Sequence, residues 1–335
     1  MAQSQPQTRP RAGVDLGVDH VGPPPTATEL AQGVAGASQR LPTLAGELVG
    51  RRQRSLWGDA WRRLLKNKLA VIGLVIVTLF IGLAVLAPLI APYGAAEVVD
   101  PRLARLEPSW TWPFGLDPNG RDIFSRILYG ARVSLVVGVL SQIIVVLIGV
   151  PVGALAGYLG GAVDNTLMRA VDVIYAIPQL LLVLLFVNWW GSGLTNIFLA
   201  LGLVGWVTEA RLVRGQFLAL REQEYVNAAK VSGAKSAYII VRHILPNSLT
   251  PIIVALTFGI PTAIFTEAAL SYVGVGIMPP QPSWGNMVAD GSRPGYIQSD
   301  PHMLLFPVLA IGLTMLGFTF LGDGLRDALD PKGND

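Results

Sequence analysis

The chain has 335 residues, of which 52% are hydrophobic and only 14% charged, and its mean hydropathy is +0.51. Soluble domains carry about 25% charged residues, so this composition favours a membrane protein with several spans. A formal net charge of +3 does not indicate a nucleic-acid-binding protein, and no basic run is interleaved with aromatic residues as single-strand binders require. The absence of cysteine excludes disulfides and thiolate metal sites.

The first 50 residues differ from the rest in composition. They are rich in Pro, Gln, Ala, Gly and Thr, as in PQTRPRAG and VGPPPTATEL, and show no sustained apolar period. Such a segment buries too little surface to offset the entropy of ordering, so residues 1–50 are predicted to be a disordered cytoplasmic tail. The first apolar run begins near Leu69, too far along the chain for a cleavable signal peptide, and is interpreted as a retained span.

Apolar runs of the length needed to cross a bilayer, about 20 residues, recur along the chain. The sequence therefore predicts an all-α, polytopic membrane domain over 69–322, preceded by a basic segment, 51–68, and followed by a cytoplasmic C-terminus, 323–335. The six predicted spans are about 69–91, 133–158, 167–189, 194–210, 249–275 and 303–322.

Lys and Arg gather in two places, which sets the expected orientation. Seven lie between Gly50 and Leu69, against one acid, Asp59, and six more lie between the fourth and fifth spans. Cytoplasmic loops carry such an excess of basic residues, and with six spans both regions share a side. The five arginines between the first two spans are matched by five acids. We therefore expect both termini in the cytoplasm and the chain in a bacterial inner membrane.

The insertion between the fourth and fifth spans, about 211–248, carries two amphipathic patterns. In the first, Tyr225, Ala228, Ala229 and Ser232 fall at helical spacing, and Gly233 stands where a helix C-terminal glycine belongs. In the second, one face is formed by small and branched apolar residues and the pattern ends at Pro246. That face consists of Ala237, Ile240, Val241 and Ile244. Two short helices hinged at a glycine indicate either a surface bound by another protein or an interfacial hairpin on anionic lipid.

NAAKVSGAKSAYIIVRHILPN resembles the cytoplasmic "EAA" loop of binding-protein-dependent ABC importer permeases, in which this loop docks on the ATP-hydrolysing subunit. Asn227 stands where that motif has Glu, and His243 where it has Ile. The matching residues are Ala228, Ala229, Gly233, Leu245 and Pro246. The residues that the resemblance assigns to an ATPase-coupling loop are Glu224, Tyr225, Asn227, Ala228, Ala229, Gly233, Ala234 and Pro246.

Further stretches resemble the dipeptide/oligopeptide/nickel subfamily of these permeases, and in particular its C-type permease. They lead into the first span (SLWGDAWRRLLKNKLAVIGL) and the second (FGLDPNGRDIFSRILYGARVSL), or lie in the last external loop (SYVGVGIMPPQPSWGNMV) and at the C-terminus (GDGLRDALDPK). From Asp122 on, an apolar face opposite Arg121, Ser125 and Arg132 predicts an interfacial helix that leads into the second span.

The resemblance implies a non-catalytic subunit that forms a peptide translocation path with a homologous permease. It also implies two cytoplasmic ATPase subunits, an external substrate-binding protein and contact with membrane lipid. The chain itself is expected to bind no cofactor and no metal, because ATP and Mg would be bound by the partner subunits, and no nucleic acid. The alternatives are a nickel or glutathione importer permease of the same family, or a self-powered secondary transporter.

A few polar and small residues inside the predicted spans are candidates for further roles. Glu267, an acid within a span, is a possible path or gate residue, with structural hydrogen bonding as the alternative. The glycines 149, 153 and 157 predict close helix packing. Asp164, Arg169 and Asp172 are expected to form a local ion-pair network. No phosphate-binding loop, H-E-x-x-H or G-x-S-x-G motif occurs, so the sequence names no catalytic site.

Overall fold

The computed structural model describes residues 56–330, together with Thr26 and Thr28. The predicted tail, 1–50, lies outside the described residues except for those two. Residues 51–55 of the predicted basic segment and 331–335 of the predicted C-terminus also lie outside them. Contacts divide the chain after Ser55, and the unit that follows is described here by itself. Within residues 56–330 the regular elements are all helical, which confirms the predicted all-α class.

Two helices and a short turn precede the second span, and the remaining helices follow in chain order. The elements are α2 (Leu56–Lys66), α3 (Lys68–Ile90), the 3-10 turn η1 (Pro101–Leu103), α4 (Ile123–Leu159), α5 (Gly161–Tyr175), α6 (Gln179–Trp190), α7 (Leu194–Arg221), α8 (Glu224–Val231), α9 (Ser236–Ile239), the π-helical turn η2 (Ile240–Ile244), α10 (Leu245–Tyr272), α11 (Trp284–Gly291), α12 (Tyr296–Ser299) and α13 (His302–Leu329).

Five helical stretches of the described residues are long and apolar enough to cross a membrane, or six if a bent pair of helices, α5 and α6, counts as one span. The five are α3, α4, α7, α13 and the run Ser236–Tyr272, which joins α9, η2 and α10. The predicted third span, 167–189, is not one helix, because α5 and α6 meet at 81°. Pro178 disfavours the helical conformation of Ile177 before it, which explains the break. The last helix continues to Leu329, beyond the predicted span end at 322.

The second span also differs from the prediction. No separate interfacial helix leads into it, because α4 is one continuous helix of 37 residues that starts at Asp122, whose carboxylate accepts a hydrogen bond from the Ser125 backbone N–H. At 1.5 Å per residue α4 is about 55 Å long, well over the roughly 30 Å of a hydrocarbon core. Arg121 and Ser125, which the pattern placed on a polar face, are buried by the loops around them.

A buried cluster of charges explains why these polar residues turn inward. Asp117 accepts a hydrogen bond from Arg121 Nε at 2.7 Å and forms an ion pair with Arg126. Asp290, on α11, lies 3.6 Å from Arg126. Burying an arginine costs several kcal/mol unless it is paired, and the two aspartates provide that pairing. The cluster therefore fixes the loop before α4 against α11.

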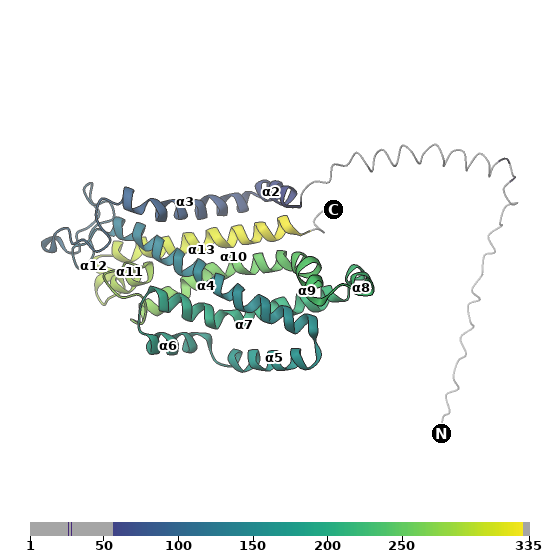
Figure 1. The fold of residues 1–335 in the computed structure, drawn as a ribbon. Helices are drawn as coiled ribbons and strands as arrows, with labels where there is room; N and C mark the ends of the chain where they lie inside the picture. The colour runs from purple at the N-terminus through teal and green to yellow at the C-terminus, as the bar shows by residue number, and fades with distance from the viewer. Residues whose placement is uncertain (1–25, 27, 29–55, 331–335) are drawn as a thin grey trace, which may run out of the picture. The chain divides into compact units, whose positions relative to one another are not determined.

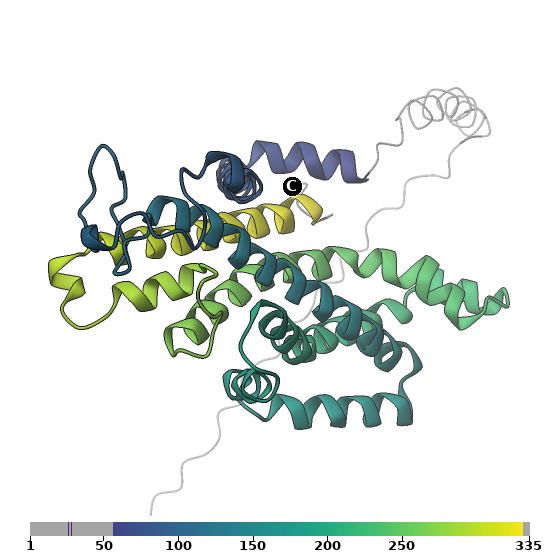
Figure 2. The ribbon, with the colours of Figure 1, turned by 60° about the vertical axis from the view of Figure 1, so that its left-hand side comes forward.

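The two ends of the bundle differ in character (Figure 1). At one end lie α2, α8, α9 and the last turns of α13, and at the other lie α11 and α12. Figure 2 shows the hairpin of α8 and α9, in green, projecting from its end of the bundle. The two regions rich in Lys and Arg that the sequence placed on a common side thus share one end, as far as they are described.

The helices α4 and α7 pack closely along a row of glycines. A Cβ atom on Gly149 would lie 2.9 Å from the Trp206 carbonyl oxygen, and one on Gly157 would lie 2.7 Å from the Arg214 carbonyl oxygen. Gly153, one turn from each, faces the Ala210 carbonyl oxygen. Small residues at every fourth position let two backbones approach this closely, so the predicted packing role of these glycines is confirmed.

Replacing Gly153 by leucine should destabilise the fold by roughly 1–3 kcal/mol or more, because overpacking a close backbone contact forces the helices apart. A Cβ at this position already lies 2.8 Å from Val213 Cβ. The matched control is Gly82→Leu on α3, where a Cβ would meet no atom within 4 Å. Thermal unfolding in detergent should show a lower Tm for G153L alone. Equal Tm values for the two variants would contradict this account of the packing.

Candidate functional site

The helix α8 follows α7 after a short turn, and one buried side chain anchors it. Val226 is fully buried in an apolar cluster with Phe217 of α7 and with Ile239 and Ile244 of the second half of the hairpin. At the end of α7, Arg221 Nη1 donates a hydrogen bond of 3.2 Å to the Gly157 carbonyl at the end of α4. The hairpin is therefore packed onto the ends of three spanning helices.

The other side of α8 is open. Tyr225 and Ala228 are exposed, Ala229 is half-buried, and Val231 is 90% exposed. Glu224 and Asn227 are also exposed, so the sequence-predicted residues of this helix form one accessible surface of small and polar side chains. A surface of small side chains allows a second protein's backbone to approach closely.

Gly233 ends α8 in the way that the sequence predicts. Its φ of +81° is the left-handed conformation that favours glycine. The Ala234 N–H donates to the Ala229 carbonyl and the Gly233 N–H to the Lys230 carbonyl, both at 3.0–3.1 Å. These two bonds are the Schellman pattern, which satisfies carbonyls that the end of a helix leaves free. The chain then turns sharply into α9.

The second half of the hairpin departs from the predicted pattern. The helix does not end at Pro246, because the π-helical turn η2 precedes it and α10 begins at Leu245 with the proline in its first turn. Proline is tolerated there because the first N–H groups of a helix have no intrahelical partner. The wider turn also changes the buried face: Ile239 and Ile244 are buried, five residues apart, whereas Ala237 and Val241 are exposed.

Two ion pairs at the same end of the bundle join α5 to α7. Arg214 donates two hydrogen bonds to Asp164, at 2.5 and 2.7 Å, and Arg211 donates one to Asp172 at 2.6 Å. The expected network of Asp164, Arg169 and Asp172 is therefore wrong in its cation, since Arg169 forms no ion pair within residues 56–330. The arginines come from α7, which the spacing within α5 did not indicate.

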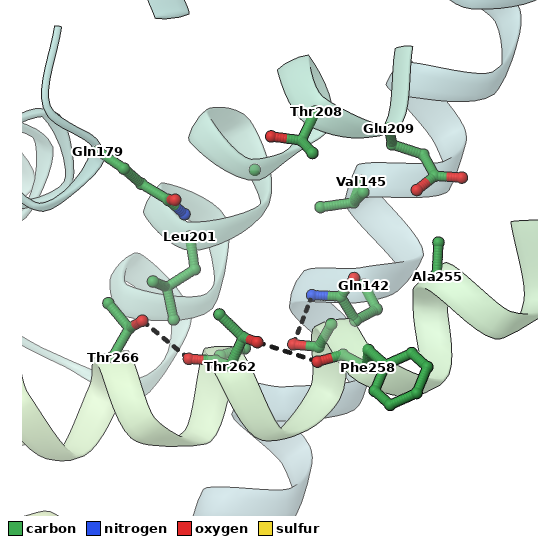
Figure 3. A pocket seen from close by; sticks show the side chains of 13 residues that line it. Gln142, Val145, Gln179, Leu201, Thr208, Glu209, Ala255, Phe258, Thr262 and Thr266 are labelled. Carbon is green, nitrogen blue, oxygen red and sulfur yellow. Dashed lines mark hydrogen bonds between the residues drawn. The ribbon is translucent and has the colours of Figure 1, made fainter. Parts of the chain in front are cut away.

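A cavity of about 260 Å³ opens between α4, α6, α7 and α10. Figure 3 shows Thr208 and Glu209 on the α7 side and Thr262 and Thr266 on the α10 side, with Gln142 of α4 between them. Sequence analysis did not identify these residues. Glu209 lies at the edge of the predicted fourth span, and an acid within a span is the signal that could have identified it.

Glu267, the acid that the sequence did single out, is elsewhere. It is fully buried in α10, and Ser271 Oγ donates a hydrogen bond of 2.8 Å to its Oε1. The other carboxyl oxygen, Oε2, and the hydroxyl of Ser134 are buried and make no hydrogen bond within residues 56–330. Glu267 does not line the cavity of Figure 3. Its bond to Ser271 lies within α10.

Two family models match the chain. The model for the binding-protein-dependent transport system inner membrane component covers residues 149–334, more than half of the chain. The chain belongs to this family. A second model, for the N-terminal transmembrane domain of oligopeptide transport permease C, matches residues 55–108 of the permease. The resemblance noted in the sequence is thereby confirmed, and the chain is the permease of an ABC importer rather than a self-powered secondary transporter.

Curated relatives of the permease support the same family assignment, and this chain aligns with nearly the whole length of each. The oligopeptide transport system permease protein OppC of Bacillus subtilis (strain 168) is 44% identical over 85% of this chain and 93% of that protein. The dipeptide transport system permease protein DppC of the same organism is 47% identical over 85% of this chain and 88% of that protein. The glutathione transport system permease protein GsiD of Pectobacterium atrosepticum is 42% identical over 83% of this chain and 92% of that protein.

Among solved structures, the permease is similar to a chain of the MetNI methionine ABC transporter in an inward-facing conformation. The TM-score is 0.51 at 21% identity, over 61% of this chain and 96% of that one. At this level of identity the likeness concerns the fold. It shows that the helical bundle described above is an arrangement found in ABC transporters.

Gly233→Val should loosen α8 without unfolding the permease. A left-handed conformation costs a residue with a side chain roughly 1–2 kcal/mol, and a branched one more. Amide hydrogen exchange within α8 should therefore become about tenfold faster or more. The control is Gly215→Val, in the interior of α7, where a Cβ likewise meets no atom within 4 Å but φ is not positive. If the amide hydrogens of α8 exchange at an unchanged rate in G233V, Gly233 does not stabilise the end of this helix.

Proposed function

We propose that the permease pairs with a homologous permease, and that the pair forms the membrane path of a peptide importer. Two cytoplasmic ATPase subunits would drive it and an external binding protein would deliver the substrate. The relatives whose names give a substrate act on oligopeptides, dipeptides or glutathione, and all three are peptides. A nickel importer remains the alternative within the family. Hydrolysis of ATP belongs to the partner subunits in this proposal.

The observation that carries the proposal is the exposed surface of α8. It comprises Glu224, Tyr225, Asn227 and Ala228, with Ala229 at its edge, and the Gly233–Ala234 turn closes it. Small side chains admit a partner's backbone, and the apolar cluster beneath connects the surface to α7 and α10. A partner that displaces α8 would therefore displace two spanning helices. Pro246, in the first turn of α10, lies at the other end of the same hairpin.

The orientation in this proposal places α8 in the cytoplasm of a bacterium. The argument is the shared end of the bundle: α2 and the α8–α9 hairpin both carry basic residues, and cytoplasmic segments are rich in these. Both termini of the membrane domain then lie on the cytoplasmic side. The opposite end, with α11 and the cluster around Asp117, faces the binding protein.

Crosslinking tests the proposal directly, because the chain has no cysteine of its own. Ala228→Cys provides a single thiol on the α8 surface, and a short thiol crosslinker should join it to an ATPase subunit in the assembled complex. Glu107→Cys, exposed in the loop before α4, is the control and should form no such product. The same complex in proteoliposomes should take up peptide only with ATP and the binding protein.

Two results would count against the proposal. One is an assembled complex in which position 228 never crosslinks to the ATPase while other contacts do. The other is peptide uptake by the permease without an ATPase, driven by a proton or sodium gradient.

A further inference from the structure

The cavity of Figure 3 contains a buried carboxylate that no other group of the described chain satisfies. Glu209 is 6% exposed, and within residues 56–330 it makes no hydrogen bond and no ion pair. Its Cβ and Cγ pack against Gly149 of α4, and its carboxylate borders the cavity. An acid in this position is costly, and membrane proteins place such groups toward a polar path or a partner.

Glu209 lies in the second half of α7, two residues before Arg211. Counted along α7 at 1.5 Å per residue, it lies about 22 Å from Leu194 and about 18 Å from Arg221. Among the residues that line the cavity it is the one with an ionisable side chain. No lysine or arginine of the described residues borders this space, so an ionised Glu209 finds no counter-charge in the cavity from residues 56–330.

Three uncharged polar side chains of the cavity, those of Thr262, Thr266 and Gln142, are placed to accept hydrogen bonds. The Thr262 hydroxyl donates its proton to the Phe258 carbonyl at 2.9 Å, and the Thr266 hydroxyl donates to the Thr262 carbonyl at 2.8 Å. Gln142 Nε2 donates to the Gly259 carbonyl at 3.2 Å, which leaves its carbonyl oxygen as an acceptor. A hydroxyl that has donated its proton still offers lone pairs. The three side chains and the Glu209 carboxylate therefore offer acceptors to one space.

The face of the permease around the cavity is also too polar for lipid. Thr208 and Thr262 are exposed on the free chain, although both lie inside spanning helices. In the importer, this face of α7 and α10 therefore borders water or the homologous permease.

We propose that this cavity is a subsite for the amino-terminal ammonium group of the peptide during its passage. An ammonium group has three N–H donors and one positive charge, which match the acceptor oxygens and the carboxylate. The proposal rests on the proposed function, since it names the part of the substrate that this chain would hold. A basic side chain of the homologous permease is the competing occupant.

A single thiol next to the carboxylate tests the site without transport. Thr208 is exposed, and its side chain makes no hydrogen bond within residues 56–330 that a change to cysteine would remove. The Thr208→Cys variant therefore leaves the acceptor oxygens of the other cavity residues in place. In the full complex, with partner subunits that carry no cysteine, the rate of modification by a cationic thiosulfonate reagent is compared with the rate for an anionic one. Adding Glu209→Gln, which keeps the shape and removes the charge, should lower this cation-to-anion ratio about tenfold.

Either of two outcomes would overturn the subsite. If the thiol of the Thr208→Cys variant does not react in the assembled complex, the partner permease fills the cavity. If it reacts with the same charge preference whether or not Glu209→Gln is added, the carboxylate does not select a cation. Glu107→Gln, which removes an exposed acid of the external loop, is the control and should leave the ratio unchanged.

Uptake measurements then connect the site to the substrate. The peptide and its N-acetylated form are chosen so that the isolated binding protein binds both. In proteoliposomes, E209Q should raise the KM for the free peptide about tenfold and leave the KM for the acetylated one unchanged, and Glu209→Asp should restore part of the difference. An equal loss for both peptides would mean that Glu209 only supports the fold. A complex with wild-type permease that imports no peptide would refute the proposed function and not the charge preference of the cavity.

Discussion

The close contact between α4 and α7 is the constraint on which the other features of this bundle depend. Gly149, Gly153 and Gly157 bring the two backbones together along a little over two turns, and α7 is thereby held in one register against α4. That register places the Glu209 stem against Gly149 and directs its carboxylate to the cavity. At the end of the same seam, Arg221 reaches the last carbonyls of α4. The cavity and the hairpin are therefore positioned by one packing contact.

The hairpin of α8 and α9 is also held in place by close packing. Val226, Phe217, Ile239 and Ile244 form a close-packed cluster at the junction of α7, α8 and α10. Close-packed interiors do not compress, so a displacement of α8 must be passed on to the helices beneath it or must unfold the cluster. The ion pairs from Arg211 and Arg214 carry α5 along with α7. The bend of 81° between α5 and α6 interrupts the helix after Asp172, and it can absorb the difference.

The sequence predicted the features that depend on local pattern. Apolar length identified five spans that are continuous helices, the four-residue glycine spacing predicted close helix packing, and Gly233 marked the end of α8. It failed where a distant residue decides the outcome. Arg211 and Arg214 pair with acids some 40–50 positions away, and Arg126, which pairs with Asp117, also lies 3.6 Å from Asp290 on α11. The π-turn before α10 carries no compositional signal. Ile244 was therefore assigned correctly to the buried face, whereas Ala237 and Val241 were not and Ile239 was missed. Glu209 and the side chains that can accept hydrogen bonds in the cavity show no common spacing in the sequence, because three different helices supply them.

The two buried acids of this membrane domain differ in their surroundings more than in their depth of burial. The surroundings of a buried acid, not its burial, distinguish a structural role from a functional one. Glu267 is the more deeply buried of the two, yet Ser271 Oγ donates a hydrogen bond of 2.8 Å to its carboxyl group. That bond satisfies one oxygen of the acid within α10, away from the cavity of Figure 3. Glu209 is slightly more exposed and makes no hydrogen bond within residues 56–330, and two neighbouring threonines, Thr262 and Thr266, have given their protons to backbone carbonyls. Its cavity combines negative charge with oxygen acceptors. Such a site is unfavourable when empty and becomes favourable when a cation enters it, which is the property that a transient station on a transport path requires.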